Sequence, residues 1–592
     1  MEFSRFASYL SQLEKTTKRL EITDILSKLI RETSIEETDK AVYLSLSQLG
    51  PLFAQIDFAI AEKMMIKIIC LAYTEDEKTV KDLYEKEGDL GNVAEELRKK
   101  HKGAHKKPDV LEVYEILKEI AEVSGAGSQE KKVNKFAQLL KELDSLSTRY
   151  AVRIPLGNSR LGFSEITVVE ALSWMKKGDK SLKEDIEKYF HIYPDIGKIA
   201  KLFKRGGLIA LEKGINLEIG VPILPQLCQR VASASEAIEK LEGKAGAEVK
   251  YDGTRVQLHL DRKRMVKPNK DQLTLFKGDE EVPFVKTFTR NLEETTNMFP
   301  DVIKSAIDHV DAQSAIIDGE AVGFDPKTKK LIPFQETSQR KRKHGIIEKI
   351  SEIPLKYFVF DLLYLNGKTL LDKPFSERRE ILQKIVKKND SIIVDDQHIV
   401  SDPEILLKLF KDAREMGLEG LVIKRLDSKY EAGGRGFAWV KFKREETGGL
   451  EDTIDGVILG YYFGRGARAK FGIGGFLVGI YDKKGDKFLT VSKVGSGPTE
   501  VEWQEIKKRV DKIKVKEKPS NVEVNKILNC DVWAKPEIMV VIRADEITVS
   551  DAHTAGFALR FPRLMQFRED KRPQDSTAVS EIKRLYELQK RS

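Results

Sequence analysis

Residues 248–255 read Glu-Val-Lys-Tyr-Asp-Gly-Thr-Arg, and they place Lys250 in an apolar, strand-like setting with one residue between it and an Asp-Gly pair. Asp-Gly favours a tight turn, and the alternation of apolar and polar residues over Val256–Leu260 has the period of a strand. The stretch therefore predicts strand, turn and strand, with Lys250 at the mouth of the turn and Arg255 close by. Positive neighbours and partial burial both lower the pKa of a lysine, which frees its amine to act as a nucleophile. Taken alone, such a pattern is more often an exposed hairpin with ordinary surface charges.

Length and composition bound the kind of protein. At 592 residues the chain is expected to hold roughly three or four domains. A hydrophobic share of 41% and a charged share of 33% are typical of a soluble chain with an apolar core, not of a disordered one. Lys and Arg number 102 against 94 Asp and Glu, and the resulting net charge of +8 permits nucleic-acid binding without demonstrating it.

The three cysteines, Cys70, Cys228 and Cys530, lie far apart and form no Cys-x-x-Cys pair. We therefore expect neither a structural zinc site nor a disulfide framework, which fits a reducing compartment. No apolar run reaches the ~18 residues of a membrane span, and the N-terminus lacks the apolar segment of a secretory signal. These features predict a cytoplasmic protein without a membrane partner, associated with the nucleoid if the source is a prokaryote.

Apolar periodicity divides the chain into three predicted domains. Helical spacing dominates up to about residue 220, where Asp89 and Asp109 are expected to cap two of the helices. From 221 to 446, strand-like runs alternate with helical ones, which is typical of a mixed α/β domain. After a predicted hinge at Gly448, short apolar segments separated by glycines, with a final charged helix, predict a small β-barrel within 447–592.

One loop in the helical region has the composition of a phosphate-binding segment. Residues 153–162 hold two arginines, Arg153 and Arg160, and two glycines, Gly157 and Gly162, ahead of the next predicted helix. Glycines allow backbone amides to approach a phosphate, and a helix N-terminus attracts anions. An ordinary turn with flanking charges is an equally common structure for such a stretch.

Beyond residues 250–255, further short motifs follow in order along the chain. They are Phe-Thr-Arg-Asn at 288–291, Ile-Asp-Gly-Glu-Ala-Val at 317–322, Phe-Gln-Glu-Thr at 334–337 with a basic run at 340–343, Phe-Asp-Leu-Leu-Tyr-Leu-Asn-Gly at 360–367, Glu-Gly-Leu-Val-Ile-Lys at 419–424, Trp-Val-Lys-Phe-Lys at 439–443 and Arg-Glu-Asp-Lys at 568–571. A lone Lys-x-Asp-Gly is weakly specific. The ordered set spans almost the whole chain, and it resembles the ATP-dependent DNA ligases of archaea and of eukaryotic replication, members of the covalent nucleotidyltransferase superfamily.

The resemblance implies a multidomain fold and a reaction. The parts would be an all-α N-terminal DNA-binding domain over 1–220, a mixed α/β nucleotidyltransferase (adenylation) domain over 221–446 and a C-terminal β-barrel OB-fold domain over 447–592. ATP would donate AMP, with Mg²⁺ as the metal and Mn²⁺ able to substitute. Lys250 would form lysyl-AMP, AMP would pass to the 5′-phosphate of a nick, and the 3′-hydroxyl would then expel AMP. The expected partner is nicked double-stranded DNA, bound by a monomer during replication, repair and recombination.

The resemblance also implies roles for particular residues. Those expected to contact the nucleotide around the nucleophile Lys250 are Glu248, Arg255, Arg290, Glu320, Phe360, Lys424, Arg435, Lys441, Lys443, Arg568 and Lys571. Glu320 and Glu419 would hold the metal, since carboxylates suit a Mg²⁺ that keeps its waters, and the resemblance equally allows Glu320 to bind the ribose hydroxyls instead. Phe360 would stack on adenine, and Glu248 would read its edge. Arg568 and Lys571 would swing onto the triphosphate and away again. The residues expected to contact DNA are Arg153, Gly157, Arg160, Gly162, Arg465 and Arg468.

The chain departs from the family pattern at three places. The connection between Arg255 and Arg290 is longer than usual, and we expect an enlarged, charged hairpin or loop from Arg262 to Pro283, which bears on the assignment of Arg290. Asn158-Ser159 stands where the family usually has Asp-Leu. No clear Gln-x-x-hydrophobic-x-x-Phe-Phe peptide is present, so a sliding-clamp partner is left open.

Two other classes of protein were weighed against this assignment. RNA ligases and mRNA-capping guanylyltransferases share the Lys-x-Asp-Gly and Glu-Gly-x-Val-x-Lys patterns, but they would not explain the helical N-terminal region or residues 334–337. A non-catalytic DNA-binding scaffold would typically have lost Lys250 or the paired glutamates, which this chain retains. Within the ligases, an NAD-dependent enzyme is disfavoured because three isolated cysteines cannot supply its four-cysteine zinc site.

Overall fold

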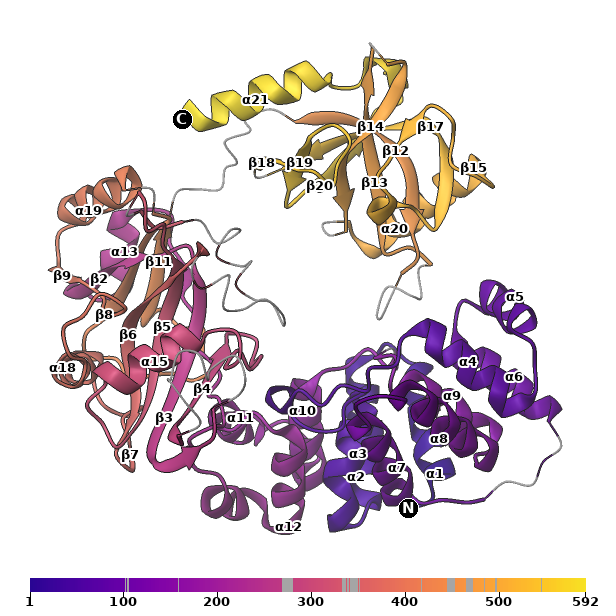
Figure 1. Ribbon diagram of the computed structural model, residues 1–592, viewed down its shortest axis with the longest axis horizontal. Helices are drawn as coiled ribbons and strands as arrows, with labels where there is room; N and C mark the ends of the chain where they lie inside the picture. Colours follow the sequence, from indigo (N-terminus) through magenta and orange to yellow (C-terminus); the bar gives the residue numbers. More distant parts are fainter. Residues whose placement is uncertain are drawn as a thin grey trace. The chain divides into compact units, whose positions relative to one another are not determined.

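The computed structural model describes residues 1–592 except 102, 104–105, 158, 269–279, 329, 333–336, 338–339, 341–349, 351, 417, 444–452, 465–471, 484, 496–497, 545 and 592. The chain forms two compact units, Met1–Ser159 with Phe163–Arg444, and Arg160–Gly162 with Glu445–Ser592. The first unit holds a helical part and a part with two sheets, and the second is rich in strands (Figure 1). The predicted order of a helical, a mixed and a β-rich region is confirmed.

Amphipathic helices build the N-terminal part, and several of them have a side-chain cap at the N-terminus. They are α1 (Phe3–Glu14), α2 (Arg19–Glu32), α3 (Ile35–Ser45), α4 (Glu62–Tyr73), α5 (Glu77–Glu87), α6 (Leu90–Lys100), α7 (Val110–Glu122), α8 (Ser128–Glu142), α9 (Ser145–Arg153), α10 (Glu165–Lys177), α11 (Lys183–Ile192) and α12 (Ile196–Gly214). The carboxylates of Asp89 and Asp109 accept hydrogen bonds from the backbone amides of Asn92 and Glu112, each at 2.8 Å, and satisfy donors that the first turn leaves free. Both predicted caps are therefore confirmed.

Two sheets form the part of the first unit that follows. Its strands are β1 (Gln229–Arg230), β2 (Ala245–Lys250), β3 (Thr254–Val266), β4 (Val282–Thr289), β5 (Ser314–Gly323), β6 (Leu355–Leu365), β7 (Lys368–Thr369), β8 (Ile392–Val394), β9 (Gln397–Val400), β10 (Gly420–Arg425) and β11 (Trp439–Lys443), and its helices include α13 (Ala234–Lys240), α15 (Pro300–His309), α18 (Phe375–Ile385) and α19 (Pro403–Glu415). Among the described residues, one sheet has the order β1-β11-β10-β2-β9 and the other β4-β3-β5-β6-β7, with β8 beside β6.

The turn after Lys250 connects these two sheets. β2 ends at Lys250 and pairs with β9 and β10, whereas β3 begins at Thr254 and pairs with β4 and β5. The predicted strand, turn and strand are confirmed, but the two strands do not form a hairpin with each other. A Cβ on Gly253 would lie 2.6 Å from the carbonyl oxygen of Ala321 on β5, so only glycine fits where the chain enters β3. Lys250 thus lies at the crossover between the sheets.

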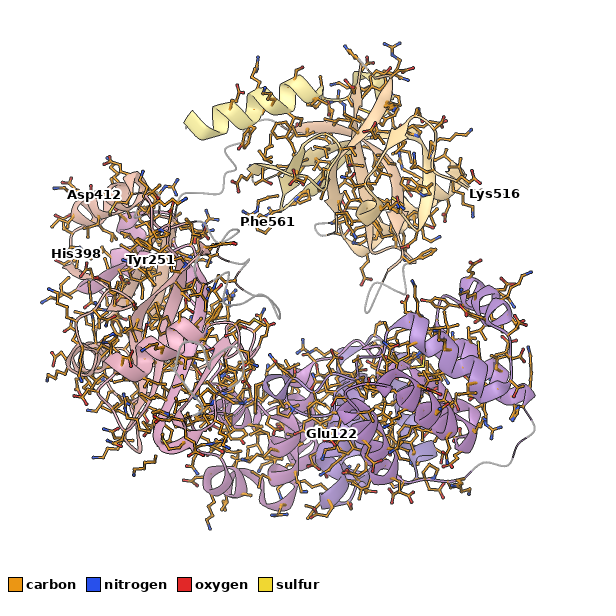
Figure 2. The ribbon with its side chains drawn as sticks, viewed as in Figure 1. Glu122, Tyr251, His398, Asp412, Lys516 and Phe561 are labelled. Carbon is orange, nitrogen blue, oxygen red and sulfur yellow. The ribbon has the colours of Figure 1, made fainter. Side chains whose placement is uncertain are left out.

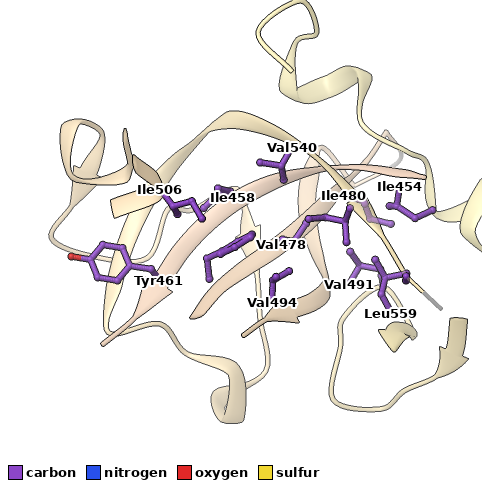
Figure 3. Packing of buried hydrophobic residues seen from close by; sticks show 14 of the residues in the cluster. Ile454, Ile458, Tyr461, Val478, Ile480, Val491, Val494, Ile506, Val540 and Leu559 are labelled. Atoms are coloured by element: carbon purple, nitrogen blue, oxygen red, sulfur yellow. The ribbon is translucent and has the colours of Figure 1, made fainter. Parts of the chain in front are cut away.

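The second unit is a bulged, mostly antiparallel sheet with a helix packed on its core, and it also holds a separate two-stranded sheet. Its elements include β12 (Ile454–Tyr462), β13 (Gly475–Asp482), β14 (Lys487–Val494), α20 (Glu500–Lys512), β15 (Lys514–Val515), β16 (Val522–Glu523), β17 (Val532–Arg543), β18 (Glu546–Val549), β19 (Phe557–Arg560), β20 (Arg563–Phe567) and α21 (Val579–Arg591). Strands β12, β13 and β14 direct Ile458, Val478 and Val491 into a buried cluster that Ile506 of α20 closes (Figure 3). A bulge between Ile458 and Gly460 bends the sheet around this cluster.

Candidate active site

A cavity of about 630 Å³ opens where the two sheets of the first unit meet. Residues from β2, β10 and β11 of one sheet and from β3, β5 and β6 of the other line it. The sequence-predicted site residues that line it are Glu248, Lys250, Arg255, Arg290, Glu320, Phe360, Glu419, Lys424, Arg435 and Lys441. Residues spread over nearly two hundred positions of the chain are therefore gathered around one space.

Lys250 meets a carboxylate at the edge of this cavity. Its Nζ forms an ion pair with Glu419, which precedes β10. The backbone fixes this pairing, because Glu419 N donates a hydrogen bond to Lys250 O at 3.2 Å and Gly420 lies opposite Lys250 in the β2–β10 register. The other carboxylate oxygen of Glu419 lies 3.3 Å from Lys443 Nζ. Glu419 therefore bridges the predicted nucleophile and a predicted phosphate-binding lysine.

Glu248 is the centre of a buried charge network on the wall of the cavity. Its carboxylate lies 2.8 Å from Arg379 Nη1 and 2.5 Å from Lys424 Nζ, and it accepts a hydrogen bond from Gln397 Nε2 at 3.0 Å. Lys424 Nζ also lies 4.4 Å from the centroid of the Phe360 ring. These contacts hold a charged carboxylate–lysine pair against an aromatic ring, in a place where unpaired charges would be costly.

Arg255 is held on the opposite wall by β5. Its Nη2 lies 2.6 Å from Asp318 Oδ2, and its Nη1 donates a hydrogen bond to Gln226 O at 2.7 Å. Burial opposes the charge on the Arg255 guanidinium, but the Asp318 carboxylate outweighs it and raises the pKa of the guanidinium. Tyr430 OH donates a second hydrogen bond to Asp318 at 2.8 Å. Arg255 is thus a fixed, permanently positive feature of the cavity wall.

Several titratable groups in the cavity are shifted toward their neutral forms, Glu320 and Lys441 among them. Burial raises the pKa of Glu320 to about 7; Glu419 acts in the same direction, while Lys250 and Arg255 oppose it. Burial also lowers the pKa of Lys441, helped by the positive charges of Lys443 and Lys250. The lowered lysine pKa that we resolve in this cavity therefore belongs to Lys441. A carboxyl group with a raised pKa and a lysine with a lowered pKa around one cavity are typical of a functional site.

Two buried polar atoms of the cavity lining have no partner within the described part of the protein. They are the indole nitrogen of Trp439, whose side chain is 1% exposed, and the hydroxyl of Thr254. Buried polar groups are almost always hydrogen-bonded, so an unsatisfied donor on a cavity wall indicates that a ligand or water completes it. The cavity is therefore built to receive a polar ligand.

Some predicted nucleotide contacts lie at the margin of the cavity or outside it. Lys443 contacts Glu419 but is not part of the cavity lining, and the exposed side chains of Arg290 and Arg435 reach the lining from loops. Arg568 and Lys571 belong to the second unit, where Arg568 Nη2 lies 2.7 Å from Asp570 and Lys571 Nζ lies 2.5 Å from Asp455. Both cations are paired with carboxylates of their own unit.

The predicted DNA-contact residues have contrasting environments. Arg153 is the last residue of α9 and is only 1% exposed, and it lies 3.0 Å from Asp89 and 2.9 Å from Glu14. This arrangement ties helices together and does not present its guanidinium to a phosphate. Gly157, Arg160 and Gly162 have φ values of 63°, 59° and 71° in the left-handed region, as a tight loop requires. Arg465, Arg468 and Asn158 lie outside the described residues, as do Gly448, residues 334–336 and residues 341–343.

The sequence did not identify several residues of the site. Asp395, Cys228 and Tyr251 line the cavity, and Arg379 of α18 holds Glu248. Asp395 has no motif around it, and Arg379 lies more than a hundred residues from its partner in the chain, so no local signal marks either. Among the described residues, no three His, Cys, Asp or Glu side chains form a metal-binding group, and none of the described helices is long and apolar enough to span a membrane.

Comparisons with known proteins agree with the ordered motifs. Family models described as "DNA ligase N terminus", "ATP dependent DNA ligase domain" and "ATP dependent DNA ligase C terminal region" match residues 2–173, residues 225–267 with 277–443, and residues 469–571. The middle match is interrupted at 268–276, inside the stretch from Arg262 to Pro283 that the sequence marked as longer than usual.

Curated relatives match the chain from end to end. The "Probable DNA ligase" of Dictyoglomus turgidum is 42% identical over 599 residues, which cover 100% of this chain and 98% of the relative. "DNA ligase 2" of Thermofilum pendens is 36% identical over 615 residues, with 100% and 98% covered. The solved structure named "Pmar-Lig_PreS3" shares the fold, with a TM-score of 0.53 and 17% identity over 95% of this chain and 99% of that one. With three matching family models and relatives of this identity along its whole length, the chain belongs to the ATP-dependent DNA ligases.

Proposed function

We propose that the cavity around Lys250 binds ATP and that Lys250 Nζ becomes adenylated on the way to a sealed DNA nick. The observation that carries this proposal is the position of Lys250. It lies at the crossover of two sheets, on a cavity of about 630 Å³ that also presents several carboxyl groups, several cations and two unsatisfied polar atoms. A space of this volume accommodates a nucleotide-sized ligand.

In the first step the lone pair of Lys250 Nζ attacks the α-phosphorus of ATP. An N–P bond forms, the P–O bond to pyrophosphate breaks, and the product is a lysyl-AMP phosphoramidate. The proton released from the amine passes to Glu419, which contacts Nζ, and from there to water. Arg255 and Lys441 on the cavity lining offset the negative charge that builds up on the phosphate oxygens.

Glu320 and Glu419 fit a divalent cation such as Mg²⁺. Both offer carboxylate oxygens to the same cavity, and the raised pKa of Glu320 reflects burial beside another carboxylate, a situation that a cation would relieve. When bound, Mg²⁺ would supply Lewis-acid stabilisation of the phosphate oxygens, with Mn²⁺ able to replace it. The two glutamates would bind the cation, and water molecules would fill its remaining coordination positions.

The later steps use the same cavity on nicked duplex DNA. The 5′-phosphate of the nick attacks the AMP phosphorus and regenerates Lys250; the 3′-hydroxyl then attacks the activated 5′-phosphate and releases AMP. We also propose that Arg568 and Lys571 act on the triphosphate during the first step, exchanging Asp570 and Asp455 for phosphate oxygens. Contacts with the DNA backbone should make binding strongly salt-dependent.

Labelling with α-³²P nucleotides tests the proposal. The protein is incubated with Mg²⁺ and, in parallel, with labelled ATP, GTP or NAD, and it is then denatured. We expect a covalent label from ATP that nicked duplex DNA discharges and that Lys250→Ala abolishes. Lys244→Ala, which removes an exposed lysine just before β2, is the matched control and should label normally. Labelling from GTP alone, or undiminished labelling of Lys250→Ala, would overturn the proposal.

A further inference from the structure

Asp395 lies on the wall of the cavity and is not explained by the chemistry above. It directly follows β8, lines the cavity, and is only 3% exposed. Its backbone is held from two sides, because its amide donates a hydrogen bond to Val359 O at 2.9 Å and Arg379 Nη2 donates one to its carbonyl oxygen. A carboxyl group is therefore fixed in the lining with little freedom to turn away.

The Asp395 side chain has one oxygen bound and one available. Tyr251 OH donates a hydrogen bond to Asp395 Oδ1 at 3.0 Å. Tyr251, labelled in Figure 2, stacks on Phe358 with ring centroids 4.1 Å apart, so this donor is itself rigid. The hydrogen bond that the described residues make to this side chain goes to Oδ1, and none goes to the other carboxyl oxygen, Oδ2. It is the atom that remains for a ligand.

The charges around Asp395 favour its neutral form. Burial raises the pKa of Asp395 to about 8, and the Glu248 carboxylate acts in the same direction, against Tyr251, Lys424 and Arg379. These groups come from β2, from the turn after it, from β10 and from α18, and they have the largest effects on the pKa of the carboxyl group. Near neutral pH, Asp395 therefore holds a proton that it can donate.

Glu248, in contrast, is an acceptor. Its carboxylate forms ion pairs with Arg379 at 2.8 Å and Lys424 at 2.5 Å, and it lines the same cavity as Asp395. The cavity wall thus carries an acidic donor and a carboxylate acceptor that share Arg379 as a common support. Adenine shows the complementary pair on either edge, an exocyclic amine beside a ring-nitrogen acceptor, whereas guanine shows O6 where adenine has its amine.

We propose that Asp395 is a base-specificity residue, which donates a hydrogen bond to a ring nitrogen of adenine while Glu248 accepts one from the exocyclic amine. The inference rests on the proposed ATP site. Guanine would place its O6 lone pairs against the Glu248 carboxylate, so the pair selects ATP over GTP both by attraction and by repulsion. Asp395 takes no part in the transfer of AMP, so its effect belongs to nucleotide binding.

The test compares Asp395→Asn, Asp395→Leu and the control Asp396→Asn, an exposed neighbour, in self-adenylation with ATP and GTP across pH. In the wild type, KM for ATP should rise as the pH passes about 8, because Asp395 then loses its proton. Asp395→Asn should keep a low KM at every pH, because its amide donates without titrating. Asp395→Leu should raise KM for ATP about ten-fold or more and leave kcat nearly unchanged, and its preference for ATP over GTP should shrink.

Nucleotide analogues make the test independent of the leucine variant's folding. 1-Deaza-ATP and 7-deaza-ATP each lack one ring-nitrogen acceptor, and one of them should lose affinity in the wild type and in Asp395→Asn. The inference would be overturned if both Asp395 variants kept the KM for ATP, the pH profile and the preference for ATP of the wild type. It would also be overturned if the binding of both analogues were unchanged relative to ATP. Absence of any ATP label on the wild type, or a label that survives in Lys250→Ala, would instead overturn the proposed function.

Discussion

Replacing Arg153 by alanine separates a structural role from a DNA-binding role for this residue. The sequence placed Arg153 in a phosphate-binding loop, whereas the structure buries its guanidinium at the end of α9 between Asp89 and Glu14. Asn92 Oδ1 accepts a third hydrogen bond from it at 3.0 Å, and the guanidinium carbon lies 5.5 Å from the centroid of the Tyr150 ring. Loss of these contacts should weaken the packing of α1, α6 and α9.

The size of the effect follows from which charges are left unpaired. Removing one partner of a buried ion pair costs about 3–5 kcal/mol. The Asp89 side chain is 3% exposed and would bear most of this cost, whereas that of Glu14 is 25% exposed and can be partly hydrated. We therefore expect a loss near the lower end, about 3 kcal/mol. For a transition of the helical part alone, which is about 200 residues long, that corresponds to a fall of about 6–12 °C in Tm.

Calorimetry of the full chain and DNA binding at several salt concentrations measure the two roles separately. Arg153→Ala should lower the transition of the helical part and leave the salt dependence of binding to a nicked duplex unchanged. Arg153→Lys keeps the positive charge but loses the planar guanidinium with its several donors. Its Tm should therefore lie between those of the wild type and Arg153→Ala. Arg5→Ala, which breaks the exposed pair with Glu32 at 2.9 Å, is the control and should change stability by less than about 1 kcal/mol. An unchanged Tm together with a salt slope reduced by about 0.9, the value for one lost phosphate contact, would refute the structural role.

Three further predictions concern other parts of the molecule. Wild-type self-adenylation should decline as the pH falls through about 7, because Glu320 must be ionised to hold a cation. The same raised pKa destabilises the fold as the pH rises toward 7. Glu320→Gln should therefore have a higher Tm than the wild type above pH 7 and should not become adenylated. A lower Tm of this variant would contradict the reasoning. Arg568→Ala combined with Lys571→Ala should impair self-adenylation and spare nick sealing by pre-adenylated protein, and equal loss of both steps would count against the proposed role. Gly207 has φ 66° and ψ −148° inside α12, a conformation that nearly excludes other residues. Gly207→Ala should therefore lower the free energy of unfolding, measured by denaturant titration, by about 1–3 kcal/mol. The loss should exceed that of the control Gly178→Ala, because an L-residue can adopt the φ of 77° and ψ of 7° found at Gly178.

Local patterns in the sequence predicted local structure well. Asp89 and Asp109 cap the helices that follow them, because an N-cap needs only a side-chain oxygen two or three residues before a free amide. The strand, turn and strand around Lys250 were equally predictable from alternation and the Asp-Gly pair. Ten of the predicted catalytic, nucleotide and metal residues line one cavity, as expected from their membership in one ordered set of motifs.

Contacts between distant segments could not be predicted in the same way. Arg153 has the composition of a phosphate-binding loop, and only folding places Asp89 and Glu14 against it. Asp395 has no motif around it, and it becomes part of the site because β8 pairs with β6 and ends at the cavity. Ion pairs and burial depend on which segments meet, and residue spacing along the chain does not contain that information.

Lys250 combines both kinds of information. The sequence by itself determined its place at the end of a strand before a tight turn, its membership in an ordered set of ligase motifs, and the chemistry available to an amine there. The tertiary structure decided that β2 and β3 belong to different sheets, so that the turn crosses between them and Lys250 faces a cavity and not solvent on a hairpin. The physical reason is that strand pairing is a choice among partners far apart in sequence, and that choice sets which charges surround the amine.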